Sequence, residues 1–210
     1  MPVQLRFHTG LTGADYVTRE GWRLASLEYC PEHGPGGGCD FSRHGTYDRK
    51  TPPGTEIARW YCRTAGCTFS LLPDHLAARL PGTLSEIEQV VVTVEQAGSV
   101  EAAAKGLRSV YISQPSVVRW IRRRVDPVRK LLPMVVELLP QVLRGCAPTL
   151  SALRVRLACD QVLVSLRALT GVHLQALVPP LGFKPPPYAR DERKSRFQQY
   201  KGHDPPAGRR

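Results

Sequence analysis

Four of the six cysteines in this 210-residue chain lie between positions 30 and 67, in a segment rich in glycine and proline. A segment of this composition is too short to build an apolar core of its own, so metal binding explains its thiols better than burial does. A structural zinc ion takes four nitrogen or sulfur ligands in a tetrahedron, commonly two from each of two tight turns. The clustering therefore predicts a bound zinc ion, which limits how the first third of the chain can fold.

Two turns carry the candidate ligands. In "CPEHG", Cys30 and His33 have C-x2-H spacing, and the glycine that follows lets the backbone curl so that its amides face the sulfur. In "CRTAGC", Cys62 and Cys67 have C-x4-C spacing. We predict Cys30, His33, Cys62 and Cys67 as the ligands, with Cys39 as an alternative to His33.

The segments around these turns favour β-structure. Residues 40–49 and 55–61 are extended in character and are separated by "KTPPG", a turn signal made by paired proline and a glycine. A hairpin over these residues brings the two cysteine turns together, so we expect residues 1–80 to form a zinc ribbon. Glu32 is the one acidic residue beside any of the four preferred ligands, and a catalytic zinc also needs an open coordination position. We therefore expect the zinc to be structural.

Residues 81–126 change to a helical pattern. Apolar side chains recur at helical spacing within 84–97, Thr83 and Glu86 fit a capping box, and Gly98 fits the helix end. Two further helices are expected, each after a serine cap: Ser99 and Ser113.

The expected third helix, in "SQPSVVRWIRRRV", has an apolar side and a basic side. Its valines and Ile121 can face the first two helices, and its arginines can face outward. Three short helices with an alanine-rich second and a basic third match a helix-turn-helix. The residues expected nearest the DNA bases are Gln114, Ser116 and Arg119. The residues expected at or beside phosphates are Arg122, Arg123, Arg124, Lys105 and Arg108.

The rest of the chain divides in two. Residues 127–182 form a helical extension, in which Asp126-Pro127 signals a new helix start and Thr149 caps a helix that ends near Gly171. This extension can add to the core or form a dimer or partner interface. Residues 183–210 are rich in proline and basic residues, and we expect a disordered tail.

Net charge and hydropathy limit the partners. The formal net charge is +11, which indicates an anionic partner, with nucleic acid favoured over a membrane surface. The chain shows no cleavable leader and no apolar run of the roughly 18 residues that span a bilayer. We expect a cytoplasmic, nucleoid-associated protein with neither a membrane partner nor a small-molecule substrate.

The expected fold class is α+β, mostly α: a small β zinc ribbon, a helix-turn-helix and a helical extension. Acidic residues are few after the expected helix-turn-helix, and no strand-rich domain can carry a metal-binding carboxylate triad. We therefore expect no enzymatic activity.

The turn "RWYC…C", the following "TFSLLPDHLA" and the helix "SVVRWIRRR" together resemble a family of bacterial insertion-sequence proteins. The resemblance covers residues 28–126 and implies a short zinc-ribbon plus helix-turn-helix protein that binds the DNA ends of a transposable element. This chain departs from the family pattern, which has C-x2-C where Cys62 and Cys67 stand and a cysteine where His33 stands. The resemblance also implies that catalysis of transposition would belong to a separate transposase subunit.

The sequence thus predicts a sequence-specific DNA-binding protein, either a transposase accessory factor or a derived transcriptional regulator. Two alternatives remain open. One is a protein-interaction module that works through residues 127–178. The other is RNA binding through the ribbon, if the side chains of Arg59, Trp60, Tyr61 and Phe69 present exposed ring faces to unpaired bases.

Overall fold

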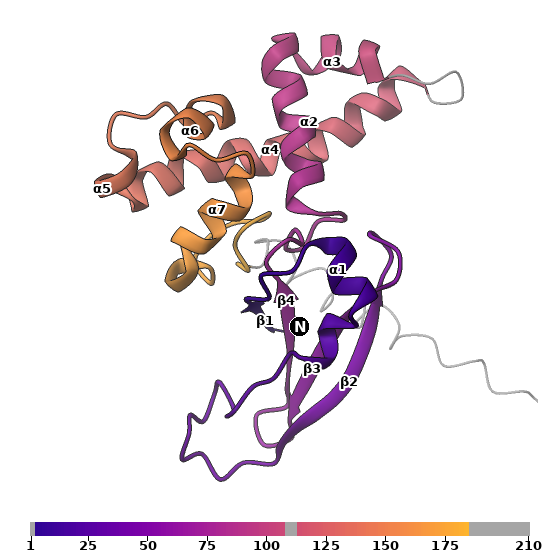
Figure 1. The fold of residues 1–210 in the computed structure, drawn as a ribbon, viewed down its shortest axis with the longest axis vertical. Coiled ribbons are helices and arrows are strands. Elements are labelled where there is room, and N and C mark those ends of the chain that lie inside the picture. The colour runs from indigo at the N-terminus through magenta and orange to yellow at the C-terminus, as the bar shows by residue number, and fades with distance from the viewer. Residues whose placement is uncertain (1–2, 108–112, 185–210) are drawn as a thin grey trace, which may run out of the picture.

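The structure is a computed structural model that describes residues 3–107 and 113–184. A small four-stranded sheet comes first in the chain, and a group of helices follows it (Figure 1). The predicted α+β class with a small N-terminal sheet and mostly helical structure is therefore confirmed. Arg108 and residues 185–210 of the predicted tail lie outside the described residues. Phe183, where that tail was predicted to begin, is buried in the helical core.

The sheet has the strand order β1-β4-β3-β2. Its strands are β1 (Val3–Phe7), β2 (Phe41–Arg49), β3 (Thr55–Cys62) and β4 (Cys67–Pro73). The β2–β3 hairpin confirms the strands predicted on either side of "KTPPG", and β3 and β4 form a second antiparallel hairpin. β1 was not predicted, and it pairs in parallel with β4, with Leu5 opposite Leu71.

One face of the sheet carries a small aromatic core. The helix α1 (Gly13–Thr18) and the 3-10 turn η1 (Gly21–Arg23) contribute Tyr16 and Trp22, whose rings meet edge to face at 5.8 Å. The Tyr16 hydroxyl donates to the backbone carbonyl of Glu56 at 2.9 Å, so the helix is tied to β3. Trp60 and Phe69 are buried in the same core.

Three helices follow the sheet and pack against one another. They are α2 (Leu84–Ala97), α3 (Val100–Leu107) and α4 (Gln114–Leu138). The predicted capping box is present, because Thr83 and Glu86 each accept the other's backbone N–H, at 3.1 and 2.7 Å. Gly98 ends α2 in the left-handed conformation, and Ser99 caps α3 by accepting the Ala102 N–H at 3.0 Å. All three of these local predictions are confirmed.

The prediction of a new helix start at Asp126-Pro127 is wrong, because α4 runs through both Pro127 and Pro133. Each internal proline removes one backbone hydrogen bond and costs about 3 kcal/mol or more. The helix continues because its buried stripe continues at helical spacing on both sides of Pro127. That stripe consists of Val117, Ile121, Val125, Val128, Leu131, Leu132 and Val135.

The predicted helix from Leu150 to about Leu169 is divided into α6 (Leu150–Leu157) and α7 (Val162–Leu169). Ala158 ends α6 in the left-handed conformation. Two acidic residues of α2 cap the helices on either side of this break: Glu95 caps α6 and Glu88 caps α7. The shorter α5 (Pro140–Leu143) precedes α6 in the chain, and the turn η2 (Gly171–His173) follows α7.

Glu88 accepts the N–H groups of Val162 and Leu163, at 3.2 and 3.0 Å, at the start of α7. Glu95 accepts the N–H groups of Leu150 and Ser151, at 2.9 and 3.1 Å, at the start of α6. The acidic character of α2 therefore has a structural cause inside this chain.

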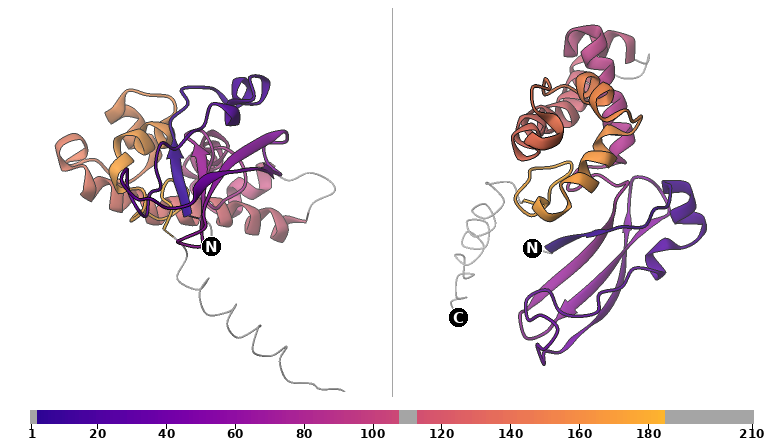
Figure 2. Two further views of the ribbon diagram at one scale, coloured as in Figure 1. Left: turned by 90° about the horizontal axis from the view of Figure 1, so that it is seen from below. Right: turned by 60° about the vertical axis from the view of Figure 1, so that its left-hand side comes forward.

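The helices from α2 to α7 gather beyond one end of the sheet, and the cysteine-rich loops lie at the other end (Figures 1 and 2). Arg167 of α7 joins the two parts. Its side chain is buried, and it donates to the carbonyls of Asp74 and Leu76 after β4 and of Pro180 and Leu181 near the end of the described chain. Burial lowers the pKa of the Arg167 guanidinium.

Candidate metal centre and nucleic-acid interface

The loop before β2 folds into a tight turn around Cys30. The backbone N–H groups of His33 and Gly34 both bond to the Cys30 carbonyl, at 3.2 and 2.8 Å. Gly34 adopts a positive φ of 69°, which favours glycine. Gly37 must also be glycine, because a Cβ there would overlap the Cβ of His33. The turn therefore fixes Cys30 and His33 on one side of a common point.

Cys62 and Cys39 complete the group from the other side. Cys62 ends β3, and Cys39 lies two residues before β2, whose Phe41 is paired with Cys62. Ala65 stands three residues after Cys62, where a C-x2-C turn would place its second cysteine, and its N–H points to the Cys62 sulfur at 3.4 Å. Cys39 therefore supplies a third thiol from the segment just before β2.

The structure thus brings together Cys30, His33, Cys39 and Cys62, with ligand atoms that all lie within 4.8 Å of one another. Three of these four belong to the predicted set, and the fourth is the alternative residue Cys39. Cys67 stands outside the group: it begins β4, opposite Cys62 in the register. His33 and Cys39, which the sequence presented as alternatives, stand together in the group.

The distances suit one tetrahedral ion. Zinc–sulfur and zinc–nitrogen bonds of about 2.3 and 2.0–2.1 Å place sulfur and nitrogen ligands about 3.6 Å apart. His33 Nδ1 lies 3.3 Å from Cys30 Sγ and 3.6 Å from Cys62 Sγ. A set of three thiols and one imidazole is a common donor set for structural zinc, and four protein ligands leave no coordination position for a substrate.

The thiols differ in acidity. Although burial acts to raise it, the pKa of Cys30 is lowered to about 7 by hydrogen bonds from the His33 side chain and from backbone groups of Glu32 and His33. The pKa of Cys39 is raised to about 11 by burial and by the neighbouring thiols of Cys62 and Cys30. Three adjacent thiolates repel one another, and a bound divalent cation would relieve that repulsion while releasing the protons.

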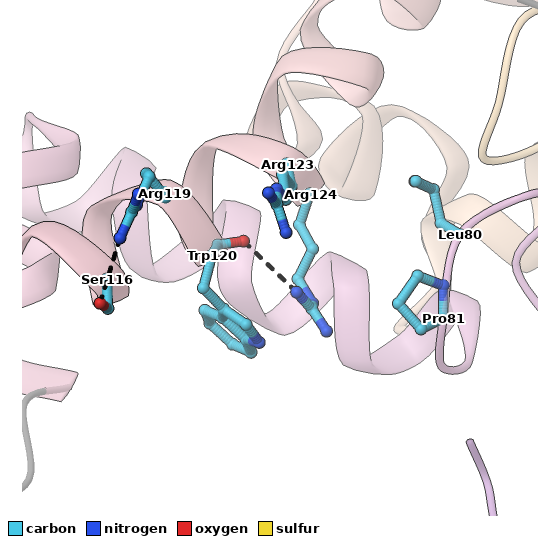
Figure 3. Close-up of a pocket in the computed structure, with 7 residues that line it drawn as sticks. All are labelled: Leu80, Pro81, Ser116, Arg119, Trp120, Arg123 and Arg124. Carbon is cyan, nitrogen blue, oxygen red and sulfur yellow. Dashed lines mark hydrogen bonds between the residues drawn. The ribbon is translucent and has the colours of Figure 1, made fainter. Parts of the chain in front are cut away.

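The second candidate site lies on α4. Its exposed side and the segment between β4 and α2 enclose a pocket of about 680 Å³ (Figure 3). The pocket is lined by Ser116, Arg119, Trp120, Arg123 and Arg124 from the helix and by Leu80 and Pro81 from the segment. Four of these seven residues, namely Ser116, Arg119, Arg123 and Arg124, are predicted DNA contacts.

The other predicted DNA contacts lie elsewhere. Arg122 turns toward α3 and forms an ion pair with Glu101 at 2.7 Å, so it ties α3 to α4. Lys105 is exposed in the last turn of α3, and Gln114 is half-buried at the start of α4. Neither lines the pocket.

The sequence analysis missed Trp120, Leu80 and Pro81 as parts of this site. Trp120 comes three residues after the buried Val117, so helical spacing places it only at the edge of the buried face, and the sequence does not signal its 43% exposure. Leu80 and Pro81 lie more than 30 positions earlier, so only the folded chain brings them to α4.

A polar junction lies where the carboxyl ends of β1 and β4 meet the helices, beside a cavity of about 450 Å³. Asp74 accepts from Arg6 at 2.7 Å and lies 2.7 Å from His8 Nδ1. Burial acts to raise the pKa of Asp74, but the contacts with Arg6 and His8 outweigh it and lower that pKa. Burial, together with the charges of Arg167 and Arg49, lowers the pKa of the neighbouring His75 to about 4.

The aromatic side chains of the sheet bear on the RNA alternative. Trp60 and Phe69 are buried, and Arg43 and Arg59 lie over the rings of Trp60 and Tyr47, at 5.3 and 5.6 Å. Burial therefore leaves Trp60 and Phe69 no free ring face for unpaired bases, whereas Tyr61 is half-buried with the His44 ring 5.6 Å away.

Comparison of the chain with protein-family models finds no match, and comparisons with curated proteins and with solved structures find none either. Within residues 3–107 and 113–184, no helix combines the length and the apolar character that crossing a membrane requires.

Proposed function

We propose that this protein binds duplex DNA sequence-specifically, with α2, α3 and α4 acting as a helix-turn-helix and the first half of α4 entering the major groove. In this proposal one zinc ion, held by Cys30, His33, Cys39 and Cys62, stabilises the far end of the sheet as a zinc ribbon. The biological role would be that of an insertion-sequence accessory factor or a regulator derived from one. The protein would have no catalytic activity of its own.

The observation that carries the proposal is the basic, solvent-facing side of α4. Arg119 and Arg123 are one helical turn apart and exposed, whereas Val117, Ile121 and Val125 hold the opposite side in the core. Arginine at such positions can reach phosphates or guanine edges in a major groove. Ser116, near the N-terminus of the helix, adds a hydroxyl at the end that approaches the bases in this class of motif.

Packing around α4 supports the same role. The connection between α2 and α3 is short, and Ala103 and Ala104 are buried, so the small α3 can lie close to its neighbours. The shared apolar core holds α4 against the other two helices, and the exposed Arg122–Glu101 ion pair adds a contact between α3 and α4. A fixed exposed helix loses little conformational freedom when it enters a groove.

A protein-interaction role has one observation in its favour. Val155 on α6 and Val172 in η2 are 83% and 90% exposed, which is high for apolar side chains. They lie on different elements, and each could take part in a dimer or partner contact beside DNA binding.

The proposal is tested by selecting duplexes from a random pool and measuring affinity by fluorescence anisotropy at several salt concentrations. We expect the double substitution Arg119→Ala/Arg123→Ala to lower affinity at least about tenfold, since one good base contact contributes about 1–3 kcal/mol. The dependence of log K on log salt should fall by about 1 for each phosphate contact removed. Arg144→Ala, at an exposed arginine in the loop after α5, is the matched control. Equal affinity of the double variant and the control would refute the proposal.

A further inference from the structure

Trp120 stands out among the tryptophans of this chain. Trp22 and Trp60 are buried in the sheet core, whereas Trp120 is 43% exposed on the basic side of α4. The buried neighbours of Trp120 on α4 already fill the contact with α2 and α3, so the core does not require an indole at this position. An exposed aromatic ring between Arg119 and Arg123 is better explained by binding than by folding.

An indole side chain can recognise little at a base edge in the major groove. The usual readers there are arginine, lysine, asparagine and glutamine, which make paired hydrogen bonds, while an indole has a single N–H donor. Its flat face instead suits stacking on an unpaired base, and every base offers such a face. The ring projects from α4 away from the helix axis, as Figure 3 shows.

The surroundings hold the ring in place. The Arg124 guanidinium carbon lies 4.0 Å from the centre of the Trp120 ring, and Arg124 also donates to the Trp120 carbonyl at 3.3 Å. This contact restricts the indole before any ligand arrives, which lowers the entropic cost of stacking. The guanidinium covers one face of the indole, so a base would stack on the opposite face.

The opposite wall of the pocket is also fixed. Arg49, at the end of β2, donates to the carbonyls of Ala77 and Leu80, at 2.7 and 2.5 Å, and so holds the segment that presents Leu80 and Pro81. The space enclosed, about 680 Å³, falls within the range of pockets that take a ligand the size of a nucleotide. Apolar walls, an aromatic face and several cationic groups together match the chemistry of a single nucleotide.

From these contacts we infer that the α4 pocket binds an unpaired nucleotide of DNA, with its base stacked on Trp120 and its phosphates held by Arg119 and Arg123. The inference rests on the proposed DNA binding and adds a substrate class to it: DNA that is locally single-stranded, as at an opened end or an extruded base. A duplex contact along α4 and a nucleotide in the pocket share Arg119 and Arg123, and only the nucleotide uses Trp120.

The test compares the full-length wild type with Trp120→Ala and Trp120→Phe on two probes, single-stranded dT20 and a mixed-sequence 20-base-pair duplex. For Trp120→Ala we expect dT20 affinity to fall about 5- to 150-fold, the loss typical of one base–aromatic stack, and duplex affinity to change less than about threefold. Trp120→Phe keeps a ring face and should recover most of the dT20 affinity. Wild-type tryptophan fluorescence should be quenched by dT20, since the other two tryptophans are buried.

Other outcomes would refute the nucleotide pocket alone or both proposals. If Trp120→Ala weakens both probes alike or neither probe, or if dT20 binds without quenching, the nucleotide pocket is refuted and the proposed duplex binding stands. If the wild type binds neither probe, both proposals fail. Circular dichroism and thermal melting of each variant check that the exposed substitution leaves the fold intact.

Discussion

Replacing Glu88 of α2 with alanine should destabilise the helical part of the protein strongly. The Glu88 side chain is 3% exposed, and its carboxylate accepts two backbone N–H groups of α7 and pairs with Arg154 at 2.7 Å. The substitution leaves two amides and a guanidinium without their acceptor. Unpaired buried amides cost about 1–3 kcal/mol each, whereas the Arg154 side chain is 38% exposed and can turn to water, so we expect a loss of about 2–5 kcal/mol, mostly from the two amides.

This loss is large, because domains of this kind are stable by only about 5–15 kcal/mol. Urea unfolding followed by circular dichroism measures it, and an unchanged m-value would show that the effect lies in stability alone. Hydrogen exchange at the amides of Val162 and Leu163 should accelerate more than exchange in the sheet.

Glu95→Ala is the graded control, because Glu95 also caps a helix but is only half-buried. We expect a loss of about 1–2 kcal/mol from this substitution, as for other helix caps. A loss below about 1 kcal/mol for Glu88→Ala, or unchanged exchange at the start of α7, would refute the capping role of Glu88.

Three further perturbations test other parts of the structure. Arg167→Met should cost about 3–5 kcal/mol in urea unfolding because it leaves several buried carbonyls without a donor, and Arg167→Lys should not restore the loss, since an ammonium cannot span them. Gly37→Ala should weaken zinc retention against a chelator because its Cβ overlaps His33, whereas Gly36→Ala, where a Cβ meets no atom within 4 Å, should not. His75 binds a proton more readily in the unfolded chain, with a pKa of 6.5, than in the folded chain, with a pKa of about 4, so stability should fall as pH drops through this window. The fall should amount to about 2–3 kcal/mol, and a pH series of urea unfolding should show that His75→Phe removes this part of the slope.

Local signals in the sequence predicted much of the fold. The Thr83–Glu86 capping box, the left-handed glycine at position 98 and the "KTPPG" turn each depend on a few consecutive residues, and the structure has all three. The apolar spacing within 84–97 also identified the buried face of α2. Such features form wherever the local chain conformation is fixed by neighbouring residues.

Contacts between residues far apart in the sequence could not be predicted from such local signals. β1 pairs with a strand more than 60 residues away, and nothing in "VQLRF" marks its partner. α4 was predicted to end before Pro127 because proline opposes helices locally, but burial of the valines and leucines beyond it outweighs that cost. Likewise, no local signal marks Glu88 and Glu95 as caps, because the helices that they cap come more than 50 residues later.

The candidate sites, too, were predicted where residue type and local spacing were enough, and missed where distant segments meet. Clustered cysteines predicted a metal site, and Cys30, His33 and Cys62 are in the group that the structure assembles. Cys39 entered that group in place of Cys67 because the β2–β3 pairing, set by the whole hairpin, carries it beside Cys62. On α4 the arginines were identifiable by type, but the pocket required Leu80 and Pro81 from a distant segment.

Zinc content per chain, measured by elemental analysis of the wild type, Cys39→Ser and Cys67→Ser, tests the metal centre most directly. We expect one zinc ion per chain in the wild type, its loss in Cys39→Ser, and its retention in Cys67→Ser, because Cys67 stands outside the four-residue group. Loss of zinc from Cys67→Ser with retention in Cys39→Ser would contradict the ligand set. A folded wild type purified without zinc, and unable to take it up, would contradict the metal centre itself.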